Sequence, residues 1–470
     1  MRTTCCVMGG PRVAGVMQRC RCGRLLPGGR NRGAALIAVL WIGMLAAVIL
    51  AGVRQAVSVN LALGQSDLEA VQARWLARAG LEQALAVLAE DDPYSDSPWD
   101  LWYDDEYTFG QIELSTGFFS VVAPPDEGQD PTIPRYGLVD LTGLLNINDA
   151  DEDQLNALID QMGLEPAAVP AILDWRDTDG NARAGGAEAA HYNSLDLPYD
   201  IRDGRFQTVD ELRLVDGIDQ ETFFGEDVNR SRMLEPFEDD GPENPPDDDA
   251  DGQLRLGLAG LTTVYSYELN RDGMGGQRVN INRASEGTLR SRFQFTRGLA
   301  RAVVQRRNSR PFQSLLDLLD VPADRSRQGG LSAGGQQEQQ VTRIDLDWLG
   351  EHLDELTLSG EDRLPARINL NTAPRQVLLT LPGMTEQAAQ SIIEFRSSPS
   401  GPFENVGQLR TQAGIDDALF RQIAERVTVR SSVFEVTSIG WTQRGVRRRL
   451  VAVVDRQASP VRVLYWYESG

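Results

Sequence analysis

Residues 34–53 read AALIAVLWIGMLAAVILAGV, a stretch without a charge that lies between Arg32 and Arg54. A helix of about 20 residues, rising 1.5 Å per residue, spans a hydrocarbon core of roughly 30 Å. A buried core helix would normally carry a polar stripe, and this stretch has none. It therefore predicts one transmembrane helix, anchored by side chains that include Leu36, Ile37, Leu40, Trp41, Leu45 and Ile49.

The residues before this stretch form a basic prefix. Residues 1–33 hold seven Arg and no Asp or Glu, and removing them from a chain of net charge −22 leaves −29. Arg-rich flanks of membrane helices stay in the cytoplasm, so we expect the acidic remainder on the other side. The prefix also contains all four cysteines, Cys5, Cys6, Cys20 and Cys22. A zinc site is the alternative use of these thiols, although their spacing fits no standard zinc pattern and no His lies nearby.

The helical pattern continues beyond the apolar stretch. Between residues 54 and 90, apolar side chains recur at roughly helical spacing, as in Leu81, Leu85 and Leu88. Asp91-Asp92 followed by Pro93 predicts the end of this helix. A secretory signal peptide is the competing interpretation, but its apolar region is usually shorter and a small-residue cleavage site follows it.

A basic leader ending in Gly33, an apolar helix directly after it and an amphipathic continuation together resemble a type IV pilin-like prepilin. The resemblance implies that a prepilin peptidase cleaves between Gly33 and Ala34, with methylation of the new N-terminus. It further implies a single-pass protein of the cell inner membrane with its soluble domain in the periplasm. Most pilins carry Glu at the fifth mature position, where this chain has Ala38. Because the K-type minor pseudopilin of type II secretion characteristically lacks that Glu, the chain is most similar to this type.

Patterns of alternating residues occur at both ends of the soluble part. The expected strands are a pair within 109–123, then 135–141, 432–440, 446–456 and 461–467. We expect an α+β fold in which these strands form one antiparallel pilin-like sheet packed on the long helix. This domain would comprise residues 54–142 and 429–470, with a large α-helical domain, 143–428, inserted between them.

The inserted region repeats itself. An Asn-apolar-Asn motif begins at Asn146, Asn280 and Asn369, and a helical pattern that ends in Arg follows each motif. Further on, Phe206 occupies the place that Pro-Phe fills in the other two segments. The sequence thus predicts three SAM-like or helix-hairpin-helix repeats, at 146–218, 280–321 and 369–415. Residues 236–252 are acidic and Pro-rich, which predicts a solvated linker.

The third repeat resembles a helix-hairpin-helix unit with Leu381-Pro382-Gly383 as its hairpin. In DNA-binding versions the Gly lets backbone amides approach a phosphate, whereas in a packing module it only permits the tight turn. The acidity of the body favours the packing module, because such a surface repels phosphates. The second repeat nevertheless holds the largest basic cluster of the body: Arg290, Arg292, Arg297, Arg301, Arg306 and Arg307.

A candidate calcium site lies in the first repeat, within DWRDTDGNARAGGAEAAHY at residues 174–192. An Asp-x-Asp-Gly turn presents oxygen ligands at the short spacing that Ca²⁺ accepts, and a plain acidic turn is the alternative. Counted from Asp177, the segment approaches an EF-hand loop, but Ala182 stands where that loop needs Gly. The K-type pseudopilin carries a similar segment and binds calcium there. The expected ligands are Asp177, Asp179 and Glu188, followed by Asn181 and Asp174, whereas Tyr192 is expected to pack.

The sequence predicts an assembly component and no enzyme. His191 and His352 are far apart, and no nucleophile or phosphate-loop motif occurs. The resemblance implies a subunit at the tip of a periplasmic pseudopilus. Its partners would be the I- and J-type minor pseudopilins, the major pseudopilin, the prepilin peptidase and secreted substrates. A membrane-tethered DNA-binding protein of competence type is the alternative, although DNA is an unlikely partner of so acidic a chain.

Overall fold

The computed structural model describes residues 32–92, 96–163, 168–241, 248, 250–324 and 340–469. The chain divides into two compact units, Met1–Asp67 and Leu68–Gly470. The basic prefix that carries the four cysteines, residues 1–31, lies outside the described residues.

Helix α1 (Arg32–Glu90) contains the predicted membrane segment. An 18-residue window near its start has a mean hydropathy of 2.7, and none of that window is buried. The six predicted anchor side chains are 57% to 67% exposed. This part of the helix is thus long and apolar enough to cross a bilayer, which agrees with the predicted anchor. The helix ends at Glu90, just before the predicted Asp-Asp-Pro stop.

Strands from both ends of the soluble part meet in one sheet, as predicted. The short helix α2 (Glu106–Phe109) leads into it, and the sheet has the order β1-β2-β12-β13-β14, with β3 also paired to β12. All strand pairings among the described residues of this sheet are antiparallel. The strands are β1 (Ile112–Leu114), β2 (Gly117–Val122), β3 (Val139–Asp140), β12 (Val433–Thr442), β13 (Arg447–Asp455) and β14 (Arg462–Ser469).

The strand predicted at 135–141 shrinks to the two residues of β3. Its first half bonds to a neighbouring loop instead, because Tyr136 N–H donates to the carboxylate of Asp104 and Leu138 N–H donates to the carbonyl of Trp102. This prediction was therefore too long. The loop at 102–104 takes the hydrogen bonds that a sheet neighbour would otherwise supply.

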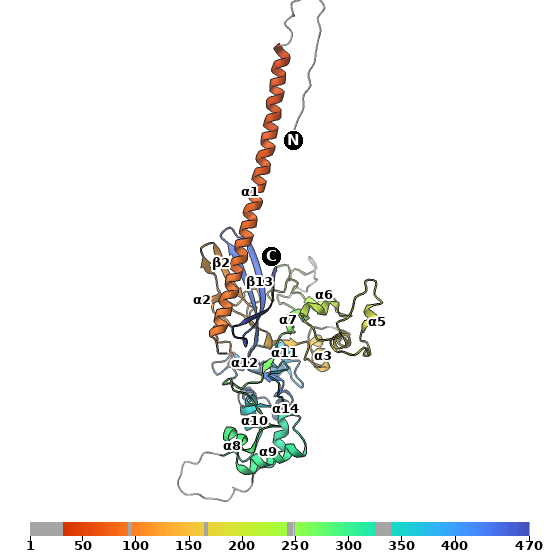
Figure 1. The fold of residues 1–470 in the computed structure, drawn as a ribbon, viewed down its shortest axis with the longest axis vertical. Helices are drawn as coiled ribbons and strands as arrows, with labels where there is room; N and C mark the ends of the chain where they lie inside the picture. Colours follow the sequence, from red (N-terminus) through yellow and green to blue (C-terminus); the bar gives the residue numbers. More distant parts are fainter. Residues whose placement is uncertain are drawn as a thin grey trace, which may run out of the picture. The chain divides into compact units, whose positions relative to one another are not determined.

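The second unit's part of α1 packs on the sheet (Figure 1). Ala77, Leu81, Ala84 and Leu88 lie in one buried cluster with apolar side chains of β2, β12 and β13. Two glycines allow this close contact. A Cβ added to Gly440 would lie 2.2 Å from the amide nitrogen of Ala77, and one added to Gly80 would lie 2.1 Å from the hydroxyl of Ser438. The glycines therefore let helix and strand approach backbone to backbone.

The region between β3 and β12 folds as three repeats, each closed by a parallel pair of two-residue strands. The first repeat comprises β4 (Leu145–Asn146), α3 (Glu152–Gln161), α4 (Val169–Arg176), α5 (Ala189–Tyr192), α6 (Gln220–Phe224), α7 (Leu258–Leu261) and β5 (Thr262–Thr263). The second comprises β7 (Val279–Asn280), α8 (Glu286–Phe293), α9 (Arg297–Ser309), α10 (Leu346–His352) and β8 (Leu356–Thr357). The third comprises β10 (Ile368–Asn369), α11 (Arg375–Leu378), α12 (Glu386–Arg396), α13 (Gln408–Thr411), α14 (Asp417–Ile423) and β11 (Val427–Thr428).

The remaining regular segments join or complete these repeats. An antiparallel pair, β6 (Glu268–Leu269) and β9 (Arg363–Leu364), flanks the second repeat. Short 3-10 helices lie at Leu141–Gly143, Val209–Leu214, Leu315–Asp320 and Leu353–Glu355. Each repeat therefore extends well beyond the predicted 146–218, 280–321 and 369–415, because its closing strand comes from later in the chain.

One set of polar contacts recurs in all three repeats. The second Asn of each motif, Asn148, Asn282 or Asn371, exchanges two hydrogen bonds with the backbone of one Phe. The Arg near the end of the second helix donates to two carbonyls, that of the apolar residue inside the motif and that of the Ala two residues after it; these arginines are Arg176, Arg307 and Arg396. The recurrence confirms the internal repetition that the sequence predicts.

The predicted linker 236–252 is anchored at its beginning. Glu238 is 1% exposed, and burial together with its neighbour Glu235 raises its pKa to about 8. Residues 242–247 and 249 lie outside the described residues. Pro236, Phe237 and residues 250–252 are exposed, so burial in the described part of the segment is confined to Glu238 and Gly241.

Candidate functional site

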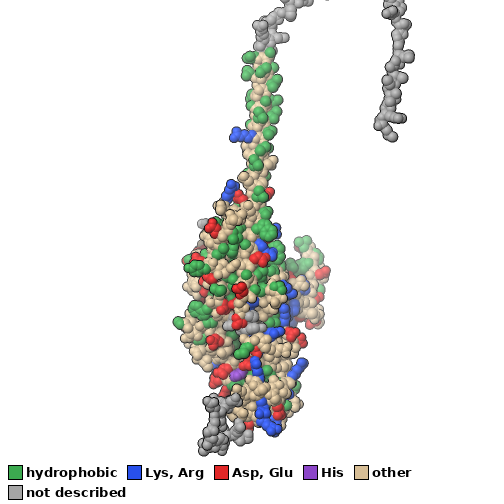
Figure 2. Space-filling view, turned by 60° about the vertical axis from the view of Figure 1, so that its left-hand side comes forward, with side chains coloured by type: hydrophobic (Ala, Val, Ile, Leu, Met, Phe, Trp, Pro, Cys, Tyr) green, Lys and Arg blue, Asp and Glu red, His purple; other side chains and the backbone are tan. Residues whose placement is uncertain are grey.

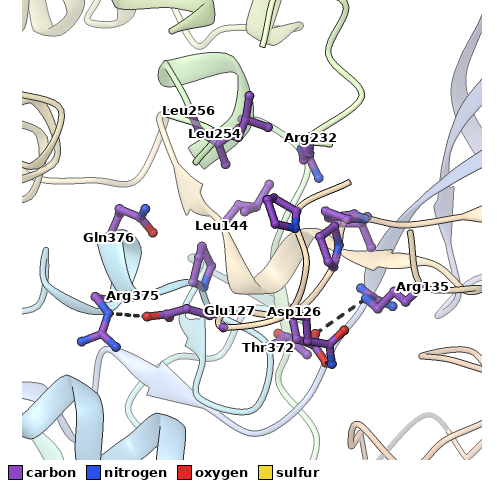
Figure 3. Close-up of a pocket in the computed structure, with 18 of the residues that line it drawn as sticks. Asp126, Glu127, Arg135, Leu144, Arg232, Leu254, Leu256, Thr372, Arg375 and Gln376 are labelled. Atoms are coloured by element: carbon purple, nitrogen blue, oxygen red, sulfur yellow. Dashed lines mark hydrogen bonds and ion pairs between the residues drawn. The ribbon is translucent and has the colours of Figure 1, made fainter. Parts of the chain in front are cut away.

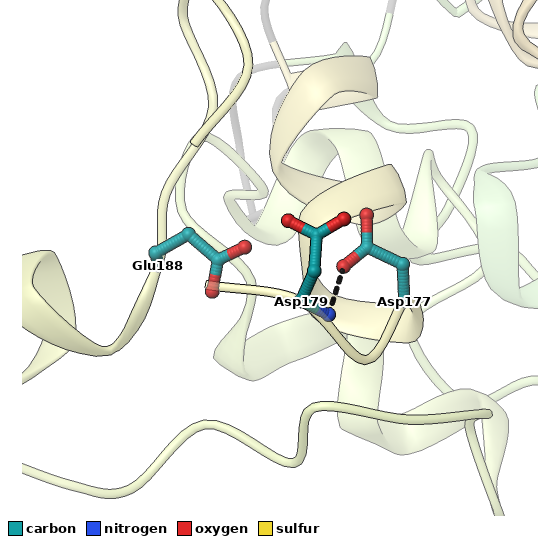
Figure 4. Close-up of side chains that lie close together, drawn as sticks. All are labelled: Asp177, Asp179 and Glu188. Carbon is teal, nitrogen blue, oxygen red and sulfur yellow. Dashed lines mark hydrogen bonds between the residues drawn. The ribbon is translucent and has the colours of Figure 1, made fainter. Parts of the chain in front are cut away.

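The predicted calcium loop brings three carboxylates together. Asp177 directly follows α4, and Glu188 directly precedes α5, so two helix ends hold the loop. One carboxylate oxygen each of Asp177, Asp179 and Glu188 lies within 4.8 Å of the others. Figure 4 shows Glu188 facing the two aspartates, with Asp179 N–H donating to Asp177. Carboxylate oxygens at this spacing are suitable ligands for Ca²⁺.

Glu188 is the member of this group whose carboxylate is buried without a hydrogen-bond donor. It is 6% exposed, and both its carboxylate oxygens are buried without a hydrogen-bond partner among the described residues. Burial raises its pKa, and so do the nearby charges of Asp174 and Asp177. A buried carboxylate with no donor is costly, and a cation at this place would satisfy it. The donor set therefore fits a divalent metal.

The other two predicted ligands make different contacts. Asp174 is fully buried and accepts hydrogen bonds from the backbone and the guanidinium of Arg183. Arg183 also pairs with Asp177 at 2.6 Å. Asn181 donates from its side chain to Asp179 at 2.8 Å. Arg183 is the member of this cluster that the sequence did not single out, since an Arg between two alanines carries no recognisable pattern.

A cluster of aromatic side chains packs next to the two ends of the loop. Tyr192 is buried, packs edge-on against Trp175 with ring centroids 5.4 Å apart, and its hydroxyl accepts a hydrogen bond from the Asp216 N–H. Trp175 in turn stacks on Phe206. The predicted packing role of Tyr192 agrees with this arrangement, which fixes the two ends of the loop.

The hairpin of the third repeat has the expected geometry. Gly383 has φ of 72°, and Gly163 and Gln294 take the corresponding left-handed conformation in the other repeats, with φ of 71° and 53°. Beside Gly383 and the start of α12 lies a hollow of about 400 Å³. The one charged residue that lines it is Asp416, and no arginine does. This face therefore lacks the positive charge that phosphate binding requires.

A second hollow, of about 550 Å³, lies between residues 124–135, residues 252–256 and the third repeat (Figure 3). Its floor includes Leu144, Leu254 and Leu256. The arginines on its wall are already engaged, since Arg375 pairs with Glu127, and Arg135 lies 3.8 Å from Asp126. The charges at this rim therefore balance one another.

The two histidines lie in ordinary surroundings. His191 Nε2 lies 3.2 Å from a carboxylate oxygen of Asp216. His352 stacks on Trp348 with centroids 4.4 Å apart, and its Nδ1 contacts the Trp348 carbonyl. Each ring thus makes contacts within its own repeat.

Two family models match the chain. Residues 137–224, which hold the carboxylate loop, match the model for protein K of the type II secretion system. This part of the chain is therefore similar to a protein K domain. This match confirms the predicted K-type resemblance. Residues 366–428 match the helix-hairpin-helix motif, which confirms the predicted hairpin and agrees with the bounds of the third repeat from β10 to β11.

Similarity to individual proteins is partial. A solved chain of the GspK-GspI-GspJ complex from enterotoxigenic Escherichia coli is 12% identical, with a TM-score of 0.47 and coverage of 87% of this chain and 99% of that chain. "Endonuclease/exonuclease/phosphatase family domain-containing protein 1" is 29% identical over 161 residues in Bos taurus and over 160 in Homo sapiens. Each of these two matches covers 32% of this chain and 28% of the relative, so the chain spans less than a third of their length.

Proposed function

We propose that this protein is a K-type minor pseudopilin, anchored in the inner membrane by the apolar part of α1, with its soluble unit in the periplasm. The protein K match at residues 137–224 carries this proposal. The apolar helix and the antiparallel sheet joined from both ends of the soluble part support it. In this role the subunit begins and caps the pseudopilus and assists the export of folded proteins. It acts by assembly and not by catalysis.

The mature N-terminus tests the membrane anchor. If a prepilin peptidase processes the chain, sequencing of the protein purified from membranes begins at Ala34, with a methylated amine. A product that begins well beyond residue 50, or that still contains the early cysteines, would refute the pseudopilin assignment. Retention of the product in the membrane fraction after a carbonate wash is the second readout.

A surface for neighbouring pseudopilins lies where α1 meets β14. A groove of about 270 Å³ is lined by Val71, Trp75 and Trp466, among others. Trp75 is 69% and Trp466 is 44% exposed, and exposed aromatic side chains of this kind often dominate protein interfaces. We expect an apolar helix face of an I-type, J-type or major pseudopilin to cover this groove.

Co-purification tests this surface. Trp75→Ala should reduce recovery of the I- and J-type subunits with the tagged full chain at least several-fold. Trp99→Ala removes a similarly exposed indole, at 67% exposure, from a turn after α1 and should leave recovery unchanged. Equal recovery with both variants would place the contact elsewhere.

We further propose that Asp177, Asp179 and Glu188 hold a structural calcium ion that ties the end of α4 to the start of α5. Calorimetric titration of the EDTA-treated full chain with CaCl₂ should give a site that Asp179→Asn and Glu188→Gln weaken at least tenfold. Asp200→Asn, an exposed carboxylate outside the group, serves as the control. Titration that is identical for all variants would rule out calcium at these residues.

A further inference from the structure

The three repeats differ sharply in charge. Repeat one, over residues 146–218, has sixteen Asp and Glu against five Arg, and repeat three, over 369–415, has three of each kind. Repeat two, over 280–321, has eight Arg against three acidic residues. In the space-filling view, basic side chains gather near the lower end, where Figure 1 places α8 and α9 (Figure 2). This basic surface is unusual on a chain of net charge −22, and its arginines can be divided into those that serve the fold and those that do not.

Several of the predicted cluster's arginines serve the fold. Arg307 binds two carbonyls of its own repeat, and Arg292 pairs with Asp272 and Glu355. Arg306 donates to a backbone carbonyl and lies 5.4 Å from the ring centre of Phe312. These three side chains need no external partner.

Three other arginines of the cluster project from one face. Arg290, Arg297 and Arg301 are exposed, and neither Arg290 nor Arg297 has an ion pair among the described residues. Arg301 approaches Glu286 of α8 at 3.9 Å, and Arg290 lies one turn beyond Glu286 on that helix. Arg297 lies one turn before Arg301 on α9. Residues four apart share a helix face, so Arg290 lies on the side of α8 that carries Glu286, and Arg297 lies on the side of α9 that carries Arg301. The three arginines, called the row below, therefore flank the contact between Glu286 and Arg301, and the Glu286 carboxylate offsets part of their charge.

The same two helices lack the features of a phosphate site. In the hairpin between them, Thr296 N–H donates to the carbonyl of Val341, and the Asp324 carboxylate lies against Gly298 in the first turn of α9. The amide and the helix start that a DNA phosphate would use therefore face groups of this chain. Both helices are fully described, and none of their large apolar side chains is exposed, so the apolar anchors of a membrane-binding helix are absent there.

We propose that the row Arg290, Arg297 and Arg301 binds an acidic segment of another protein. Carboxylates pair with guanidinium groups in a planar, bidentate manner, and three exposed arginines in a row suit a run of Asp or Glu. Attraction between such surfaces steers encounter and weakens with salt. This surface is separate from the α1–β14 groove and does not depend on the pseudopilin assignment.

Binding of poly-L-glutamate to the full chain in phosphatidylcholine nanodiscs tests this surface. The wild type should bind with an affinity that falls as salt rises, and the triple variant Arg290→Gln/Arg297→Gln/Arg301→Gln should bind at least tenfold more weakly. Arg421→Gln removes an exposed arginine of α14 in the third repeat that has no ion pair among the described residues, and this variant should stay within twofold of the wild type. Circular dichroism of each variant confirms that its helices are intact.

Two parallel measurements distinguish the partner class. A 20-base-pair DNA duplex and vesicles containing phosphatidylglycerol are titrated under the same conditions. The proposal is overturned if the triple variant binds poly-L-glutamate as well as the wild type does. It is also overturned if the triple substitution weakens binding of DNA or of the anionic vesicles more than it weakens binding of poly-L-glutamate. Unchanged co-purification of the I- and J-type subunits would show that the pseudopilin role stands apart from this result.

Discussion

Asn371 holds the backbone of Phe403 through two hydrogen bonds, one donated by the Asn side-chain amide and one accepted by its carbonyl oxygen, both at 2.9 Å. Asn371 is fully buried. Replacing it with Ala leaves a backbone N–H and a carbonyl without partners, at a cost of about 1–3 kcal/mol each. Asn371→Ala should therefore lower the free energy of unfolding by about 2–5 kcal/mol in denaturant titration. Asn193→Ala, which removes an exposed side chain that bonds to the Ala189 carbonyl, is the control and should change stability by less than about 1 kcal/mol.

Gly440 of β12 lies directly against α1, and any side chain there must push the helix off the sheet. A Cβ would lie 2.2 Å from the Ala77 nitrogen and 2.3 Å from the Ala73 carbonyl oxygen. Overpacking of this kind typically costs about 1–3 kcal/mol or more. Gly440→Ala should lower the unfolding midpoint, whereas Gly204→Ala, whose nearest neighbour would be 4.0 Å away, should not. Equal midpoints for the two variants would contradict the close helix–strand contact.

Glu268 is a buried anion among arginines. It pairs with Arg278 at 2.5 Å and with Arg367 at 3.0 Å, and Arg278 has a fully buried side chain. Although burial opposes ionisation, Arg367 and Arg278 together lower the pKa of Glu268 to about 2. The stabilisation is present above pH 4.5 and is lost as the pH falls through 2. Glu268→Gln leaves buried cations without their partner and should cost about 3–5 kcal/mol at pH 7, measured by denaturant unfolding. Glu361→Gln removes an exposed carboxylate two residues before β9, the strand that pairs with β6, and is the matched control.

Asp96 and Asp91 both pair with Arg456. Their effect on stability has the opposite pH dependence to that of Glu268. Arg456 donates to Asp96 at 2.8 Å and to Asp91 at 2.6 Å. Burial raises the pKa of Asp96 to about 7 and that of Asp91 to about 6. A raised carboxyl pKa means that the folded state takes up protons before the unfolded chain does. These two carboxyls should therefore raise stability by roughly 3 kcal/mol as the pH falls from 8 to 5.5, and Glu238, with its pKa of about 8, adds to the rise.

Thermal unfolding across that pH range measures the effect. Asp96→Asn cannot take up the proton, so its stability should rise clearly less over the same interval. Asp200→Asn, at an exposed site, should follow the wild type. A pH slope in Asp96→Asn equal to that of the wild type would show that this carboxyl does not control it.

Much of the architecture could be predicted because it depends on long patterns. The apolar run at 34–53 predicted the anchor, and the alternation at 432–440 and 446–456 predicted β12 and β13. The parallel pairs that close the repeats escaped prediction, because two residues are too few to show a period. Their partners also lie some 60 to 120 residues apart in the sequence. Spacing in the chain does not reveal such contacts.

In the carboxylate loop, too, the sequence predicted some contacts and not others. Asp177, Asp179 and Glu188 were predictable as a group because the Asp-x-Asp-Gly turn places oxygens at short spacing. The contacts of Asp174 depend on Arg183, which folds back across nine residues to reach it. The hydrogen bonds between the second Asn of each motif and the backbone of a later Phe could have been predicted. Asn-x-Asn, a helix-ending Arg and a later Phe recur together in the sequence.

The chain enters the second repeat at β7 and leaves it at β8, and these strands lie side by side. An insertion whose two ends emerge at adjacent points places no strain on its host, whatever its length. The path of the chain through the sheet and the other two repeats would thus stay the same if this lobe were shortened or removed, although Ser314 and Leu315 would no longer bond to Glu425. Excision of residues 279–357 with a short bridge would therefore join two points of the backbone that already lie side by side.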